Sequence, residues 1–237
     1  MFKLDTIKKY LYFDVETASG YESHDALIEK NPRLASLWEK RCKYYRSAFP
    51  ELSEATDSEI YNSKSPLEPE FARIVCVSFG SFDEEGLERF ASFFGPDESD
   101  ILNKANKVFN NALAKNWKLC GHNIKSFDVP CLGKRMLYNS INPSPNIQIW
   151  DKKPWEVPYV DTAEVFSFGS WVQQKYLSLD LVSCMFDVES PKNHMDGSQV
   201  SEFFWESFGD SQGYEKIKEY CESDVRTVME IMKKSCF

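Results

Sequence analysis

Two acidic residues end an apolar run near the N-terminus. The stretch "YLYFDVETAS", Tyr10 to Ser19, contains Asp14 and Glu16 with a single residue between them. Side chains alternate between the two faces of a strand, so both carboxylates are expected to point the same way. Such neighbours raise each other's pKa and need a compensating positive charge. A divalent metal ion would supply that charge most simply.

Two later segments carry residues of matching chemistry. "GHNIKSFDVPCL" places Asp128 just after a predicted strand, and "EYCESDVRTV" contains Tyr220 and Asp224 four residues apart, on one face of a predicted helix. Together with Asp14 and Glu16 they offer four carboxylates and a phenol. Hard oxygen ligands favour Mg²⁺ or Mn²⁺ over zinc. Two such ions, about 3.5–4 Å apart, can activate water and stabilise a leaving oxygen at phosphorus.

Bulk composition indicates a globular protein. The chain has 237 residues, of which 42% are hydrophobic and 15% aromatic, which is enough for a sizeable core. Its seven cysteines are odd in number and include no C-x-x-C pair, so we expect reduced thiols and a cytoplasmic location. No apolar run approaches the length of a membrane span, and no membrane partner is expected.

The net charge leaves the partner open. A charge of −9 argues against bulk electrostatic binding of nucleic acid. Two divalent cations would add +4 at one site, which changes −9 to −5 for the loaded protein.

The elements that must position these side chains follow from periodicity and turn residues. Residues 22–70 form a long, partly helical insertion after the first strand, punctuated by Pro32 and Pro50. A hairpin follows, and alternating helices and short strands complete a mixed α/β sheet flanked by helices. We expect strands at 4–15, 72–82, 87–95, 117–123 and 158–166, and helices at 97–115, from 127 to about 139, at 179–186, 198–207 and 214–235.

The ordered motifs "FDVET", "GHNIKSFD" and "YCESD" resemble those of the DEDD superfamily of 3′→5′ exonucleases. The third motif has a tyrosine four residues before its aspartate, and in this it resembles the tyrosine branch of that superfamily. The predicted exonucleases related to the proofreading domain of family-B DNA polymerases are resembled by the further stretches "EFARIVCVSFG", "KPW", "DT", "SLDLV" and "SPK…DGSQV". The likeness covers residues 10–20 and roughly 70–235. It implies an RNase H-like mixed five-stranded sheet with helices on both faces. It also implies one 3′→5′ exonuclease domain over residues 1–237, with the insertion at about 22–70.

The resemblance implies catalytic roles by position. Asp14, Glu16 and Asp224 would hold the ion that binds the attacking water. Asp14 would bridge to a second ion, which Asp128 would support. Tyr220 would orient the water, because a phenol with an ordinary pKa of about 10 is a poor base at pH 7.

Substrate-binding positions are also implied. Thr17 and Ala18 would lie against the terminal nucleotide, and Asn123 and Phe127 would shape the wall that binds the strand. Two structural alternatives stay open: Asn123 could satisfy backbone groups of its loop, and Phe127 could belong to the core.

Four other residues have ordinary structural interpretations. We expect Asp161 and Asp196 to cap turns, and His122, beside Cys120, to fill a strand end rather than bind zinc. Cys221 is expected to be a small packing residue.

Basic residues could contact phosphate at two places. "KRCKYYR" at 40–46 mixes basic and aromatic residues, which suits single-stranded nucleic acid and equally suits a solvated helix face. Lys125, Lys134 and Arg135, around the second motif, are the stronger phosphate candidates.

The expected function is a metal-dependent 3′→5′ exonuclease that hydrolyses single-stranded DNA to nucleoside 5′-monophosphates with two Mg²⁺ or Mn²⁺ ions. A DNA polymerase or replication protein is the expected protein partner. RNA is the alternative substrate. A non-catalytic nucleic-acid-binding module with the same fold is the alternative from another class, and loss of any motif acid would have favoured it.

Overall fold

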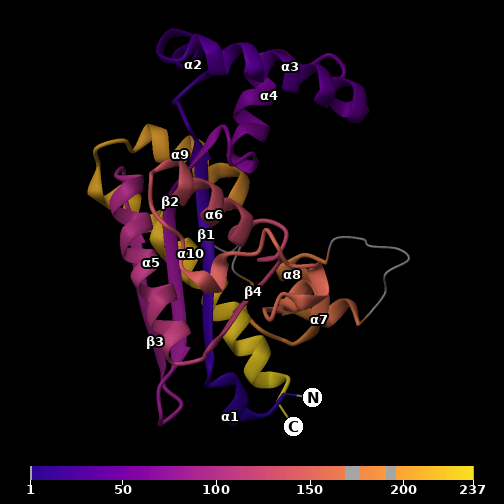
Figure 1. Cartoon of the computed structure of the whole chain (residues 1–237). Helices are drawn as coiled ribbons and strands as arrows, with labels where there is room; N and C mark the ends of the chain where they lie inside the picture. Colours follow the sequence, from indigo (N-terminus) through magenta and orange to yellow (C-terminus); the bar gives the residue numbers. More distant parts are fainter. Residues whose placement is uncertain (1, 169–176, 191–195, 237) are drawn as a thin grey trace.

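The computed structural model describes residues 2–168, 177–190 and 196–236. Within these residues one mixed sheet has the strand order β3-β2-β1-β4-β5 (Figure 1). Strand β1 is antiparallel to β2 and parallel to β4, β2 is antiparallel to β3, and β4 is parallel to β5. The strands are β1 Tyr10–Ser19, β2 Ala72–Phe82, β3 Glu88–Phe94, β4 Lys118–Gly121 and β5 Val160–Asp161.

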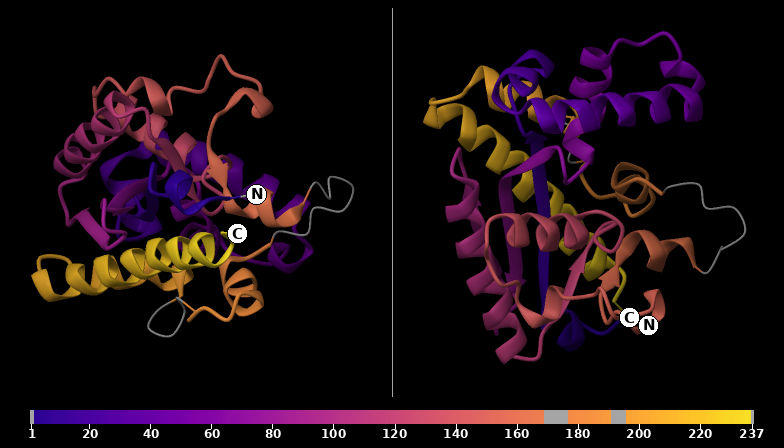
Figure 2. Two further views of the ribbon diagram at one scale, coloured as in Figure 1. Left: turned by 90° about the horizontal axis from the view of Figure 1, so that it is seen from below. Right: turned by 45° about the horizontal axis from the view of Figure 1, so that its top comes forward.

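Helices surround this sheet. Figure 2 shows α10 across one face, with α5 and α6 on the other. The α-helices are α1 Leu4–Ile7, α2 His24–Lys30, α3 Pro32–Ala48, α4 Asp57–Lys64, α5 Glu98–Ala114, α6 Asp128–Tyr138, α7 Thr162–Ser167, α8 Leu179–Met185, α9 Val200–Glu206 and α10 Ser211–Lys234. The short 3-10 helices are η1 Pro50–Leu52, η2 Ser65–Leu67, η3 Pro145–Ile147, η4 Pro154–Glu156 and η6 Gly197–Gln199.

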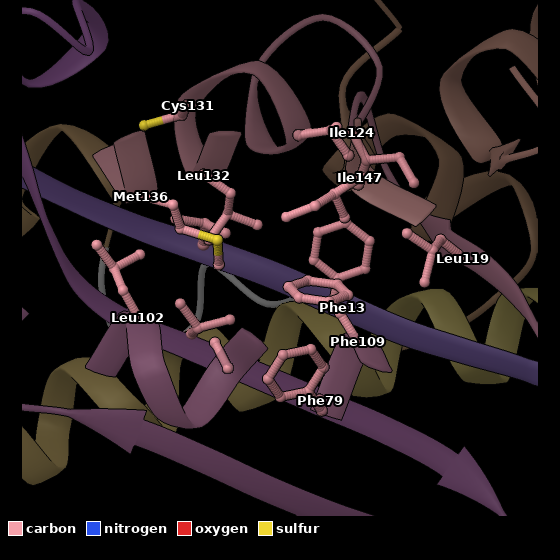
Figure 3. Packing of buried hydrophobic residues seen from close by; sticks show 14 of the residues in the cluster. Phe13, Phe79, Leu102, Phe109, Leu119, Ile124, Cys131, Leu132, Met136 and Ile147 are labelled. Atoms are coloured by element: carbon pink, nitrogen blue, oxygen red, sulfur yellow. The ribbon is translucent and has the colours of Figure 1, made fainter. Parts of the chain in front are cut away.

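Strand β1 is central and has apolar residues on both faces, because helices cover each side; Asp14 and Glu16 interrupt this pattern. Leu11, Phe13 and Val15 belong to the core beneath α5 and α6. There the Phe109 ring of α5 meets the Phe13 ring edge-on, with 5.3 Å between centroids (Figure 3). Tyr12 instead packs in the core that α10 completes. The alternation therefore directs the even-numbered residues of β1 toward α10.

The insertion has its own small core. Helices α2, α3 and α4 lie beyond the end of the sheet at which β1 finishes (Figure 1). Trp38 is fully buried there, in edge contact with the rings of Tyr61 and Phe71. Pro32 and Pro50 each stand at the start of a helix, where the missing N–H costs nothing.

Most expected elements are confirmed, and two are corrected. The 72–82 strand matches β2, and the helices expected at 97–115 and 179–186 match α5 and α8. The predicted strand at 4–15 is wrong over its first residues, because Leu4–Ile7 form a helical turn and β1 begins at Tyr10. The predicted strand at 158–166 is largely wrong, because Asp161 caps a helix there and ends β5.

Every helix within residues 2–168, 177–190 and 196–236 is too short or too polar to cross a lipid bilayer.

Candidate active site

Strand β1 presents both acids of the first motif to helix α10. Asp14 is partly exposed and Glu16 is 8% exposed. A break in the β1–β2 register falls between Glu16 and Thr17, directly after the acidic pair. Irregularities of this kind are frequent beside active sites, where they re-aim side chains.

Helix α10 brings the third motif against this pair. Tyr220 and Cys221 are buried in the cluster that joins α10 to the sheet. Asp14 and Asp224 are close enough for the charge of Asp224 to raise the pKa of Asp14. The helix therefore places Asp224 on the same side of the sheet as the acidic pair.

Cys221 packs in a buried cluster, as expected, and it also contacts Asp14, which the sequence did not predict. Its Sγ lies 3.5 Å from both the backbone oxygen and Oδ2 of Asp14, so the thiol donates to this residue. Ligand atoms of Asp14, Glu16 and Cys221 all lie within 4.8 Å of one another. The available signal was helical spacing, since Cys221 precedes Asp224 by three residues and shares its helix face.

Asp128 belongs to helix α6, which covers the face of the sheet opposite α10. Strand β4 pairs with β1 at Tyr10–Tyr12, so the edge of β1 beyond Tyr12 is open to the start of α6. Asp128 begins that helix and is 3% exposed. Its Oδ1 is buried and has no hydrogen-bond partner among the described residues. A buried carboxylate oxygen without a partner fits a site for a cation.

The four carboxyl groups lie close enough for their charges to raise one another's pKa. Burial, and then the charges of Asp128 and Asp224, hold the pKa of Asp14 well above its usual value. Burial, and then Asp14 and Asp224, do the same for Glu16. Burial is the main cause that raises the pKa of Asp128 to about 8. Like charges are thus concentrated at one place, where a bound cation would relieve the repulsion.

Tyr220 completes this cluster. The residue is 7% exposed. Its hydroxyl lies beside Gly197 of η6, 3.4 Å from the point where any larger residue would have its Cβ. Burial, followed by the charges of Asp224 and Glu16, raises the pKa of the phenol far above its usual range. The hydroxyl therefore stays protonated and can donate a hydrogen bond.

The expected substrate residues of β1 differ in accessibility. The Thr17 hydroxyl donates to the backbone oxygen of Pro66 at 2.7 Å, which ties η2 of the insertion to the strand next to Glu16. The Ala18 side chain is fully buried against α9. Ala18 could therefore contact a nucleotide only through its backbone, and both substrate roles stay predictions.

The second-motif loop is held by Asp161. Its two carboxylate oxygens accept from the backbone N–H groups of Asn123 and Lys125 at 2.8 and 3.0 Å, and Oδ1 also accepts from Ala163. The expected capping role of Asp161 is confirmed. Asn123 has φ 61, a left-handed conformation, and half-buried Phe127 precedes α6. Their contacts with substrate stay predictions.

His122 and Asp196 have the structural roles expected for them. The two ring nitrogens of His122 lie 2.9 Å from Thr162 Oγ1 and 2.7 Å from the backbone oxygen of Leu177, so His122 joins the strand end to its neighbours. Asp196 caps η6 by accepting from the N–H of Ser198.

Comparison with known proteins identifies the fold. The family model for the RNase H superfamily matches residues 64–236, which leaves β1 and its two acids outside the match. The family B DNA polymerase from the hyperthermophilic archaeon Pyrobaculum calidifontis is similar in structure, with a TM-score of 0.55 and 15% sequence identity. The likeness covers 95% of this chain and 24% of the polymerase chain, so this chain spans about a quarter of its length. A search of curated protein sequences gives no match.

Proposed function

Because the chain belongs to the RNase H superfamily, we propose that its carboxylate cluster is the hydrolytic centre of a metal-dependent 3′→5′ exonuclease acting on single-stranded DNA. The observation that carries this proposal is the convergence of Asp14, Glu16, Asp128 and Asp224 from β1, α6 and α10. The motif resemblance to exonucleases supports the direction of attack, and the likeness to a polymerase structure supports the fold.

Each acid has a defined place in this mechanism. Asp14, Glu16 and Asp224 would hold one Mg²⁺ or Mn²⁺ ion, and Asp14 and Asp128 would support a second. Bound there, such ions lower the pKa of water and stabilise the leaving oxygen. Oxygen ligands are the donors that these ions prefer.

Tyr220 would orient the attacking water rather than abstract a proton from it. Its raised pKa keeps the hydroxyl protonated at neutral pH, so the phenol cannot act as a general base. Its proximity to Glu16 and Asp224 lets it donate a hydrogen bond to a nucleophilic water. The Cys221 thiol donates to Oδ2 of Asp14 and so helps to hold this carboxylate in place.

A degradation assay tests the proposal. A 5′-labelled oligodeoxynucleotide with Mn²⁺ is expected to give a ladder shortened from the 3′ end, while EDTA or a 3′-terminal block stops the reaction. A circular single strand measures endonuclease activity, and an oligoribonucleotide measures the preference for sugar. Cleavage of the circle at the rate of the linear strand would refute the exonuclease assignment.

Matched variants test the site. Asp14→Asn should abolish hydrolysis, whereas Asp100→Asn, which changes an exposed acid on α5, should leave it intact. Tyr220→Phe should slow hydrolysis by about 100-fold, as expected for the loss of one positioned donor, and less than Asp224→Asn does. Equal losses in the Tyr220 and Asp224 variants would contradict the orienting role.

A further inference from the structure

An open groove separates the insertion from the end of helix α6. It has a volume of about 630 Å³, and its lining includes Leu34, Leu37, Lys40, Arg41 and Tyr44 of α3 and Tyr138 of α6. We propose that this α3–α6 groove binds the part of a single-stranded nucleic acid that lies on the 5′ side of the nucleotide being removed. The inference rests on the proposed function and adds a second contact region for the same strand.

The charge of α3 complements a phosphate backbone. This helix has five basic residues and one acidic residue, a net +4 within a chain of net charge −9. Arg41 pairs with Glu68 at 2.9 Å, which fixes its position, while Lys40 makes no ion pair with the described residues. The groove residue Glu70 is neutralised by Lys134 at 2.7 Å. Arg46 of the same helix also pairs, with Asp57, so Lys40 is the groove cation that has no ion-pair partner among the described residues. The acidic member of the groove, Glu70, is already paired.

Exposed aromatic rings offer surfaces for nucleobases. Tyr44 and Tyr138 are each 55% exposed, and Leu37 is 49% exposed. The neighbouring aromatic residues of the insertion, including Trp38, are buried in its core, so Tyr44 is not needed for packing in the same way. Aromatic rings interleaved with basic residues are the usual means of binding single strands without sequence preference.

The groove is connected to the candidate active site at two places. Helix α6 has Asp128 at its first residue and Tyr138 at its last, about 15 Å apart along the helix axis at 1.5 Å per residue. The segment between η2 and β2 leads from Pro66, bonded to Thr17, to groove residues Glu70 and Phe71. A strand with its 3′ end at the carboxylates therefore needs a few nucleotides to reach the groove.

Length-dependent binding tests the proposal. Fluorescein-labelled dT3, dT12 and rU12 are titrated with the full chain in EDTA, with the labelled strands checked for integrity. We expect dT12 to bind more tightly than dT3, and the rU12 arm shows whether the groove distinguishes RNA from DNA. Tyr44→Ala should weaken dT12 binding by about 5- to 150-fold, the range for loss of one stacked base, and leave dT3 unchanged. Tyr44→Phe should restore binding.

A matched pair of lysine variants tests the phosphate contact. Lys40 lines the groove, whereas Lys43 is exposed on the same helix and does not. Lys40→Ala should reduce the slope of log K against log salt by about 0.7 for dT12, and Lys43→Ala should leave the slope unchanged.

Hydrolysis of thymidine 5′-monophosphate p-nitrophenyl ester separates this inference from the proposed function. The ester occupies the carboxylate cluster alone, so Tyr44→Ala should hydrolyse it at the wild-type rate with Mn²⁺. Absence of hydrolysis in the wild type would refute the nuclease while leaving the groove measurable by binding. Equal affinity for dT3 and dT12, or unchanged dT12 binding in Tyr44→Ala, would overturn the groove proposal.

Discussion

Asp128→Asn should stabilise the protein in the absence of metal and remove part of its pH dependence. The carboxyl group has a pKa of about 8 in the folded chain and an ordinary value of 3.8, mainly because it is buried. A raised pKa means that the folded state holds the proton more tightly than the unfolded state. Stability is therefore lost as pH rises from 3.8 to about 8 and is constant above that range.

The size of the effect follows from the shift. Each pKa unit corresponds to about 1.4 kcal/mol, so the buried carboxyl costs about 4 kcal/mol at pH 7. Between pH 5 and pH 7 the loss is about 3 kcal/mol. Asparagine has nearly the same shape and no proton to lose, so this variant does not lose that stability. It also removes one charge that raises the pKa of Asp14, which acts in the same direction.

Urea unfolding in EDTA at pH 5, 6 and 7 measures the difference. The variant should be more stable than the wild type, and its advantage should grow by about 1.4 kcal/mol per pH unit. Asp100→Asn, an exposed acid paired with Lys104, is the control and should follow the wild type. Saturating Mn²⁺ should reverse the order, because ligand that binds the folded state stabilises the wild type more. Parallel pH dependences of wild type and Asp128→Asn would refute the reasoning.

Three further predictions concern contacts around the site and the insertion. Cys221→Ala should weaken Mn²⁺ binding by about 10- to 100-fold, as for other groups that orient a ligand, and Cys221→Ser should retain most of it; calorimetry that shows equal affinities would remove the thiol from the site. Glu98→Gln should cost about 3 kcal/mol in urea unfolding, because it breaks a largely buried ion pair with Arg135 at 2.6 Å; a loss below ~1 kcal/mol would contradict this. Trp38→Ala should cost about 3–5 kcal/mol if the insertion unfolds with the sheet, and limited proteolysis should then cut first between residues 22 and 70; an unchanged cleavage pattern would show that the insertion core does not depend on the indole.

Local rules predicted the elements with the strongest signals. The β-branched and aromatic run at 72–82 is a strand, and the segments expected to be helical at 97–115 and 179–186 are helices. Errors occurred where a signal was short. Four residues at Leu4–Ile7 form one helical turn, which the apolar pattern of β1 obscured, and β5 ends where Asp161 turns to cap the next helix.

The acidic residues of the site were determined by the sequence itself. Alternation along β1 requires Asp14 and Glu16 to share a face, and helical spacing requires Tyr220 and Asp224 to do the same. These relations depend on nothing beyond the local backbone. The RNase H-like fold was expected from the resemblance of the ordered motifs to those of a known exonuclease superfamily.

Tertiary structure alone decided which of these faces meet. Placement of β1 at the centre of the sheet turns its even-numbered residues toward α10, and the short β4 leaves space for Asp128 at the edge of β1. The same packing put the Cys221 thiol on Asp14 and opened the groove between α3 and Tyr138. Such contacts join residues more than 90 positions apart in the chain. Their geometry depends on strand order and helix packing, which no local pattern encodes.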